Sequence, residues 1–375
     1  MTDVLASICV TVWIYLICAR GRFWLAPVRD GARPAATNIR PSVTVVIPAR
    51  DESAVIAKSL QSLLRQDYRG PLSIIVVDDD SRDTTAAIAA GYGVTVIIGR
   101  DLPAGWTGKM WALRQGIAAT QASRADYLLL TDADIVHATD TVSWLVAQAS
   151  AGGFVLTSLM AKLRCISLAE RSHVAAFVYF FQMLFPFSWV SRHDCGTAAA
   201  AGGCMFIRTD ALHAAGGIDS VRNTLIDDCS LAVRLKSVGP IWLGLTTRVR
   251  SIRPYDKFTD IKAMISRSAY AQMRFSPWLL AVTVAGMTLT FLTPSVLAIL
   301  ASGPAQVLGA TAWLMMAVSF QPMLHFYRLS PLWGAALPGI ALLYVLYTLA
   351  SAYDHMRRRG GEWKGRMHVN APTLS

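Results

Sequence analysis

Two aspartates separated by one residue follow a run of leucines, and this arrangement suits a divalent cation. Asp132 and Asp134 come directly after residues 127–130, which read as a buried strand. Alternate residues leaving a strand end can direct two carboxylates toward one ion, and hard oxygen ligands suit Mg²⁺ or Mn²⁺ with phosphate oxygens completing the octahedron. The spacing alone is weak, since about one or two such pairs arise by chance in a chain of this composition. The position at a strand end therefore carries the prediction.

A longer acidic cluster follows the strand predicted at residues 72–77. Asp78 or Asp79 can accept a hydrogen bond from a uracil or ribose group. Ser81, with Asp83, can cap the helix that follows. The cluster thus predicts a nucleoside-binding group beside a helix start.

Two further polar groups lie near predicted helix starts. Lys109 ends a glycine-containing segment, residues 105–109, where its ammonium can meet phosphate oxygens. Asp227 and Asp228 open an amphipathic helix. Paired carboxylates there are either helix caps or a general base, because one carboxylate raises the pKa of its neighbour.

Alternating strands and helices carry these groups. Strands are predicted at residues 43–47, 72–77, 94–98 and 127–130, and helices at residues 52–64, 84–90 and 111–120. Such a series predicts a parallel α/β sheet, whose ligands bind at the carboxyl ends of the strands. Arg50, Asp51 and Glu52 follow the first strand, as the aspartates at 78–80 follow the second and those at 132 and 134 the fourth. Three acidic groups at one sheet edge are costly unless a cation or a donor-rich ligand compensates them. A Rossmann dehydrogenase is disfavoured, because no Gly-x-Gly-x-x-Gly follows the first strand.

The composition indicates a membrane protein. Hydrophobic residues make up 54% of the 375 residues and charged residues 16%, below the roughly 25% charged residues usual in soluble proteins. The net charge is +11, and in so apolar a chain it favours anionic lipid over nucleic acid. The six cysteines show no Cys-x-x-Cys spacing and predict buried thiols, not a zinc site or a disulfide framework.

An apolar run near the N-terminus predicts a membrane anchor. Residues 4–19 carry no charge, and four arginines follow them. That order favours an anchor with the N-terminus outside over a cleaved signal peptide. Residues 174–190 are also apolar. We expect an interfacial or core helix there, because a span would carry the second half of the predicted sheet domain across the membrane.

A second membrane region is predicted near the C-terminus. No Asp, Glu, Lys or Arg lies between Arg274 and Arg328, which leaves room for two spans with a break at residues 302–304. A third run, residues 331–353, is followed by arginines 357–359. Three full spans after a cytoplasmic domain would place those arginines outside, against the charge rule. We therefore expect one run to be re-entrant or a shallow hairpin.

Six segments, in their order along the chain, resemble the family 2 glycosyltransferases. They are VTVVIPARDE (43–52), VVDDDSRDT (76–84), TDAD (131–134), GGCMFIR (202–208), GGID (216–219) and DDCSLAVR (227–234). The resemblance covers about residues 41–275. GWTGKMWALRQG (105–116) and WKGR (363–366) are similar, more narrowly, to the hopene-associated subgroup.

This resemblance implies a GT-A fold: a Rossmann-like α/β domain with a mainly parallel sheet, accompanied here by N-terminal and C-terminal transmembrane helices. It implies an inverting mechanism with Mg²⁺ or Mn²⁺ held by Asp134 and Asp132, and Asp228 as the catalytic base. Asp227 is the alternative base, because the family usually has Glu-Asp at this point. The residues expected to bind substrate are Ala49, Glu52, Asp78, Asp79, Lys109, Asp132, Gly202, Gly203, Arg274, Trp363 and Arg366.

The predicted organisation has four parts: a membrane anchor (1–22), a GT-A domain (41–275), a membrane region (276–355) and a basic cytoplasmic tail with the WKGR motif (356–375). Processive synthases carry Gln-x-x-Arg-Trp, whereas this chain has Gln272 and Arg274 followed by Phe275, which argues against a polymer-making enzyme.

The predicted function is transfer of a sugar from a nucleotide-sugar donor, a UDP-sugar first, to a lipid acceptor in hopanoid metabolism. The predicted location is the bacterial cytoplasmic membrane, with several spans and the GT-A domain in the cytoplasm. Two alternatives stay open: a transferase acting on a polyprenyl-phosphate carrier, and a non-catalytic membrane nucleotide-binding protein of hopanoid handling. The intact set of Asp132, Asp134 and Asp228 weighs against the second.

Overall fold

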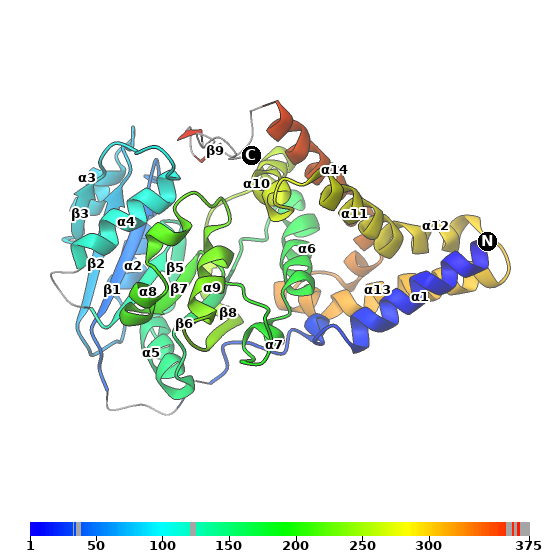
Figure 1. Ribbon diagram of the computed structural model, residues 1–375, viewed down its shortest axis with the longest axis horizontal. Helices are drawn as coiled ribbons and strands as arrows, with labels where there is room; N and C mark the ends of the chain where they lie inside the picture. The colour runs from blue at the N-terminus through cyan, green and yellow to red at the C-terminus, as the bar shows by residue number, and fades with distance from the viewer. Residues whose placement is uncertain (33, 35–38, 121–124, 358–361, 364–365, 368–375) are drawn as a thin grey trace. The chain divides into compact units, whose positions relative to one another are not determined.

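The chain forms two compact units (Figure 1). The computed structural model describes residues 1–32, 34, 39–120, 125–357, 362–363 and 366–367, the last two pairs by their backbone. The helical unit comprises Met1–Pro27, Cys165–Ser188 and Pro254–Gly361. The sheet unit comprises Val28–Arg164, Trp189–Arg253 and Glu362–Ser375.

The sheet unit is built on one sheet with the strand order β3-β2-β1-β4-β7-β6-β8-β5. Neighbouring strands among β3, β2, β1 and β4 run parallel, and so do β6 and β8. β7 runs antiparallel to both β4 and β6, and β5 is antiparallel to β8. The strands are β1 Val43–Ala49, β2 Leu72–Asp78, β3 Thr95–Ile98, β4 Tyr127–Thr131, β5 Ile135–His137, β6 Leu156–Lys162, β7 Cys204–Arg208 and β8 Ile241–Ser251.

The predicted α/β fold is confirmed, with one difference. The four strands expected from the sequence are parallel neighbours, but the later strands make the whole sheet mixed. The helices of this unit are α2 Ile56–Leu64, α3 Thr85–Ala90, α4 Gly108–Thr120, α5 Thr141–Gly152, α8 Thr209–Ala214 and α9 Asp227–Lys236, with a 3₁₀ turn η2 at Ile218–Val221.

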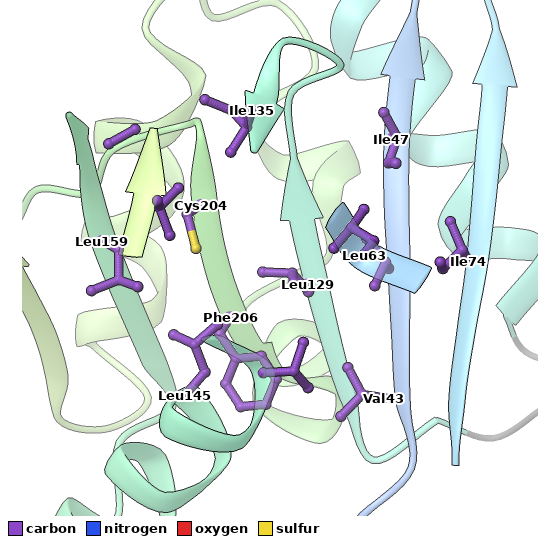
Figure 2. Close-up of a cluster of buried hydrophobic side chains, with 14 of the residues drawn as sticks. Val43, Ile47, Leu63, Ile74, Leu129, Ile135, Leu145, Leu159, Cys204 and Phe206 are labelled. Carbon is purple, nitrogen blue, oxygen red and sulfur yellow. The ribbon is translucent and has the colours of Figure 1, made fainter. Parts of the chain in front are cut away.

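One buried hydrophobic cluster of this unit lies on one face of the sheet. Figure 2 shows Val43 and Ile47 of β1 and Leu129 of β4 directed to the same face. Leu63 of α2 and Leu145 of α5 complete the same buried cluster. Burying one such side chain stabilises the fold by roughly 1.5–3 kcal/mol. The cluster therefore stabilises the strands whose ends carry the polar residues.

The other face of the sheet is covered by α4. Every residue of β1 is buried, as expected of a parallel strand covered on both faces. Gly116 permits the close approach of α4, because a Cβ there would lie 2.4 Å from Val46 and 2.9 Å from Val77. The approach positions the start of α4, and with it Lys109.

The helical unit contains three helical stretches that are long and apolar enough to cross a membrane: Pro277–Leu300, Pro304–Tyr327 and Leu337–Met356. They correspond to the three apolar runs, and the first break falls at residues 301–303, one residue before the predicted 302–304. That one run is re-entrant stays a prediction. α1, at Thr2–Cys18, is shorter and lies beside α13, at Pro304–Tyr327 (Figure 1).

The elements of the unit are α1, η1 Phe23–Leu25, α6 Leu168–Leu184, α10 Phe258–Gln272, α11 Pro277–Met287, η3 Thr288–Leu292, α12 Thr293–Leu300, α13, η4 Pro331–Gly334 and α14 Leu337–Met356. The short helix α7, Phe187–Val190, includes residues of both units.

A proline explains the irregular middle of the first stretch. Pro294 has no N–H for the carbonyl of Thr290, one turn earlier, and the segment η3 winds as a π-helix. The indole N–H of Trp13 from α1 donates to that carbonyl at 2.8 Å. A side chain from a neighbouring helix thus satisfies a group that lipid could not.

The unit boundaries differ from the predicted ones. Residues 165–188 and 254–275 were expected within the domain at 41–275, but they group with the helical unit. In α6, Tyr179 is buried and its hydroxyl lies 2.7 Å from that of Ser319 in α13. α6, which covers most of the apolar run at 174–190, is not among the candidate spans of the described chain. Helix packing, a non-local property, sets this boundary.

The C-terminal tail is described only in part. Backbone pairing joins β9, Glu362–Trp363, to β10, Arg366–Met367, as an antiparallel ribbon. The side chains of Trp363 and Arg366, and the residues between the two strands, lie outside the described residues. Their predicted roles stay predictions.

Candidate active site

The strand ends meet as predicted. Ala49 closes β1 and is paired in register with Asp78, which closes β2. The N–H of Asp79 donates to the carbonyl of Ala49 at 2.8 Å. Thr131 closes β4, one residue beyond the last pairing of that strand with β1. The carboxylates that follow these strands therefore emerge at one edge of the sheet.

A buried arginine compensates the acidic end of β2. Asp79 is fully buried, and Arg50 Nη1 lies 3.8 Å from its Oδ2 and 3.7 Å from Asp80 Oδ2. Arg50 Nη1 also donates to the main-chain oxygens of both aspartates. A buried carboxylate needs such a partner. The sequence placed Arg50 directly after β1, but no pairing with Asp79 was predicted for it.

The turn after β2 is held by short-range hydrogen bonds. Asp83 accepts the N–H of Ser53 at 3.0 Å and of Thr85 at 2.9 Å. Burial alone would raise the pKa of Asp83, but these bonds lower it well below the ordinary value. Ser81 was expected to cap α3; instead its hydroxyl accepts the N–H of Asp51 at 3.0 Å. Glu52 is tied to the same turn, since its N–H donates to the Thr85 hydroxyl.

Lys109 joins two of the predicted acidic groups. Its Nζ lies 2.9 Å from Asp132 Oδ1 and 3.4 Å from Asp227 Oδ2. Burial by itself would lower the pKa of Lys109, but the carboxylates of Asp132 and Asp227 raise it above the ordinary lysine value. Lys109 is therefore positively charged, and it lies between the end of β4 and the start of α9.

Asp134 is held by different partners. The Ser251 hydroxyl donates to Asp134 Oδ2 at 2.7 Å, and Arg253 Nε lies 3.3 Å from the same oxygen. Arg253 Nη2 also donates to Glu52 Oε1 at 2.6 Å. Arg253 thus bridges the predicted nucleoside side and the predicted metal side. Nothing in the sequence indicated this role, because Arg253 follows β8 without any local motif.

Asp228 is the carboxylate best suited to accept a proton. Its Oδ2 accepts the N–H of Gly202 at 2.9 Å, and its Oδ1 accepts the N–H of Cys229 at 2.7 Å. Burial, and then the neighbouring carboxylate of Asp227, raise its pKa to about 6, while Lys109 opposes the rise. A carboxylate tuned upward can act as a base near neutral pH.

The two glycines before β7 allow this close packing. A Cβ on Gly202 would lie 3.2 Å from Lys109 Nζ and 3.4 Å from Asp228 Oδ2. A Cβ on Gly203 would lie 3.1 Å from Ile135. The carbonyl of Gly203 accepts a hydrogen bond from the Thr131 hydroxyl at 2.7 Å. Both glycines were predicted as substrate-binding; in the structure they shape the backbone beside the carboxylates.

A buried histidine contacts the last residue of β4. His137 Nε2 lies 3.1 Å from the Thr131 hydroxyl, and burial lowers the pKa of His137 to about 4. The imidazole is therefore neutral at physiological pH.

The donor chemistry fits a hard divalent cation that brings its own phosphate ligands. In the part of the chain that the structure describes, His, Cys, Asp and Glu form no group of three with metal-site geometry. Asp132 and Asp134 offer carboxylate oxygens, and the side chain of Asp132 is 35% exposed. Mg²⁺ is usually bound by one or two carboxylates together with substrate phosphates. Two carboxylates at an open strand end match that pattern.

The structure thus brings Lys109, Asp132, Asp227 and Asp228 together, and joins Asp134 to Glu52 through Arg253. Arg274 belongs to the helical unit, where it follows α10 with a left-handed backbone, φ +52°. Its predicted contact with the leaving diphosphate stays a prediction.

Comparisons with known proteins bear on the family and the fold of the chain. Residues 41–253 match the family described as glycosyltransferase like family 2. A 4,4'-diaponeurosporenoate glycosyltransferase from Staphylococcus aureus, strain bovine RF122 / ET3-1, is 36% identical over 109 residues, and its counterpart from strain USA300 is 35% identical over 109 residues. The match covers 28% of this chain and 28% of each of these relatives.

Among solved structures, the mannosyltransferase PcManGT from Pyrobaculum calidifontis, in complex with GDP-Man and Mn²⁺, is similar with a TM-score of 0.55 and 17% identity. The similarity covers 93% of this chain and 99% of that one. At this identity the likeness concerns the fold, which is GT-A.

Proposed function

This chain belongs to the family 2 glycosyltransferases, and on that premise we propose that it is a membrane-bound inverting enzyme that moves a sugar from a nucleotide-sugar donor to a lipid. The observation that carries the proposal is the meeting of Asp132, Lys109 and the Asp227–Asp228 pair at the carboxyl end of β4. A diphosphate binder and a proton acceptor are both needed for the reaction, and this arrangement offers both.

The donor would be bound from two sides. Asp79 and Glu52, at the ends of β2 and β1, would hold the nucleoside. Lys109 would meet the diphosphate oxygens, since its ammonium lies beside Asp132. A divalent cation held by Asp132 and Asp134, when bound, would neutralise charge on the departing diphosphate. PcManGT, with GDP-Man and Mn²⁺, is a precedent on this fold; we propose a UDP-sugar as the first donor to test.

The proton acceptor would be Asp228. It takes the proton of the acceptor hydroxyl, whose oxygen then forms a bond to the anomeric carbon while the bond from that carbon to the diphosphate breaks. Nucleoside diphosphate leaves, and the configuration at the anomeric carbon inverts. Asp228 is favoured over Asp227, because Asp227 lies beside the Lys109 ammonium whereas burial raises the pKa of Asp228.

The acceptor would be a lipid. The same chain carries three helical stretches that can cross a membrane, and the Staphylococcus aureus relatives are named for 4,4'-diaponeurosporenoate. The segment at residues 105–116 favours a hopanoid-related acceptor within that class. The arginines after α1, Arg20 and Arg22 among them, support a sheet unit on the cytoplasmic side of the bacterial inner membrane.

A donor-by-lipid screen tests the proposal. The purified full-length chain in lipid vesicles is given radiolabelled UDP-sugars and GDP-mannose together with Mn²⁺ or Mg²⁺. The vesicles contain a hopanoid, a polyprenyl phosphate or neither. We expect a labelled hopanoid, identified by mass spectrometry, that Asp228→Asn does not form. A labelled polyprenyl product would move the acceptor to the carrier class, and no lipid product with any donor would contradict the proposal.

A further inference from the structure

Each carboxylate of the Asp132 and Asp134 pair already has a basic side chain of the same unit beside it. Lys109 Nζ lies 2.9 Å from Asp132 Oδ1, and Arg253 Nε lies 3.3 Å from Asp134 Oδ2. On the proposed function, these two carboxylates would hold the divalent cation. The two basic side chains would then compete with that cation for the same carboxylates.

The ion pair of Lys109 with Asp132 is exposed enough for a metal ion to replace Lys109. The side chains of Lys109 and Asp132 are 21% and 35% exposed. Solvent reaches both, so the pair can open, yet its charges are screened less than those of a surface pair. Lys109 is also shared with Asp227 at 3.4 Å, so it can leave Asp132 without losing every carboxylate partner.

The second pair is more enclosed and is linked to the donor side. The side chain of Asp134 is 11% exposed, and Arg253 contacts both it and Glu52. Asp134 Oδ2 also accepts the Ser251 hydroxyl. A guanidinium holding Asp134 on one side and Glu52 on the other fixes the direction of the Asp134 carboxylate.

We propose that Lys109 and Arg253 are positioning residues that act as internal counter-cations, keeping the affinity of the site for a lone divalent cation low. A nucleoside diphosphate supplies the negative charge that draws Lys109 from Asp132, so cation and nucleotide bind cooperatively. The inference rests on the proposed function in taking these two ligands as those of the site.

The coupling has a required symmetry. If the nucleotide raises the affinity for the cation by some factor, the cation raises the affinity for the nucleotide by the same factor. Removing the charge of Lys109 makes the carboxylates more available to the cation and takes away the group that the diphosphate attracts. The variant should therefore bind the lone cation better and show less coupling.

Mn²⁺ binding tests this without any turnover. The full-length chain in detergent is titrated with Mn²⁺, and the free ion is followed by electron paramagnetic resonance, with no nucleotide, with UDP and with GDP. Lys109→Met and Arg253→Met remove one charge each at similar side-chain length. We expect each to bind Mn²⁺ alone about tenfold more tightly than the wild type, and Lys109→Met to lose most of the enhancement by nucleotide.

Two matched variants control for folding and for charge. Arg114→Met removes a guanidinium of the same helix, α4, which pairs with Asp219 and not with the site; its Mn²⁺ affinity should equal that of the wild type. Lys109→Arg retains the charge and should keep lone Mn²⁺ binding weak. Thermal unfolding of every variant is measured in the same detergent.

The outcomes separate the inference from the proposed function. If wild-type chain binds Mn²⁺ more tightly with UDP or GDP, but Lys109→Met and Arg253→Met bind Mn²⁺ alone no better than wild type, the counter-cation role is overturned and the donor site stands. If neither nucleotide brings any Mn²⁺ to the wild-type chain, the proposed donor site itself is wrong. If one variant fails to fold, the other decides.

Discussion

Asp132 and Asp134 of the sheet unit and Glu170 of the helical unit have different kinds of partner. In the sheet unit, Asp132 and Asp134 face the side chains of Lys109 and Arg253. In the helical unit, the fully buried Glu170 accepts backbone N–H groups from Ile166, Ser167 and Tyr255 at 2.7–2.9 Å. The second kind of partner is part of the main chain and stays; the first is a flexible cation that can leave.

This difference distinguishes the two carboxylates proposed to hold a metal from Glu170, which serves the fold. Backbone N–H groups around Glu170 need it as an acceptor, because lone buried donors are costly. The Lys109 ammonium neutralises the charge of Asp132. A second cation that binds Asp132, or an anion that binds Lys109, can separate the two side chains. The contrast predicts that changes at the two sites act on different quantities, activity at one and stability at the other.

The largest effect is expected at the sheet edge. Asp134→Ala removes a carboxylate proposed to hold the metal and leaves Arg253 without one of its acidic partners. We expect metal-dependent sugar transfer to fall by about 10³-fold or more. The measurement is transfer of radiolabelled sugar to membrane lipid; transfer at the wild-type rate would remove Asp134 from the metal site.

Replacing Glu170 should instead lower the stability of the protein. Glu170→Ala leaves three backbone N–H groups without their acceptor at the start of α6. We expect a loss of about 3 kcal/mol in stability, seen as a lower Tm in detergent, with Glu170→Gln losing less because its amide oxygen still accepts. Lys109→Met should shift Tm far less. Equal shifts at both sites would break the comparison.

The pH dependence separates the paired aspartates. As a base, Asp228 must be deprotonated, and its raised pKa of about 6 means that kcat/KM rises as the pH increases through that value. Asp227→Asn removes the neighbouring charge that helps raise this pKa, so the acidic limb should move to lower pH. The check is a pH profile of both forms between pH 4.5 and 8.5, roughly two units to either side. An unmoved limb would show that Asp227 does not influence the base.

A neutral hydrogen bond in the helical unit should matter least. Trp13→Phe removes the indole N–H that donates to Thr290, while most of the aromatic contact with Phe291 is kept. We expect a loss of about 1 kcal/mol, measured by thermal unfolding, and no change in sugar transfer. A change in transfer without a change in Tm would give this contact a functional role.

Local patterns were enough to predict the strands and the carboxylates that follow them. β1, β2 and β4 are buried runs, and the residues after them are the polar groups of the site. Arg253 was beyond such patterns. It reaches Asp134 because β5 and β8 pair as antiparallel strands, and such pairing depends on the whole sheet. Contacts between segments more than a hundred residues apart have no local signature.

The grouping of two segments with the helical unit has a similar cause. Residues 165–188 and 254–275 follow sheet segments in the chain, but their helices pack with the apolar helices. One local signal was available: Ser167 and Glu170 form a capping box, which marks the start of α6. The partner of that helix, the buried surface around Ser319, could not be read from the same segment.

The most direct test of the account concerns Asp228. In Asp228→Asn, the amide can still occupy the place beside Gly202 but cannot take a proton at neutral pH. We predict that nucleotide binding in the presence of Mn²⁺, measured by calorimetry, stays within about threefold of wild type, whereas sugar transfer falls by about 10²–10⁴-fold. Transfer at a rate comparable to wild type would contradict the account and place the base elsewhere.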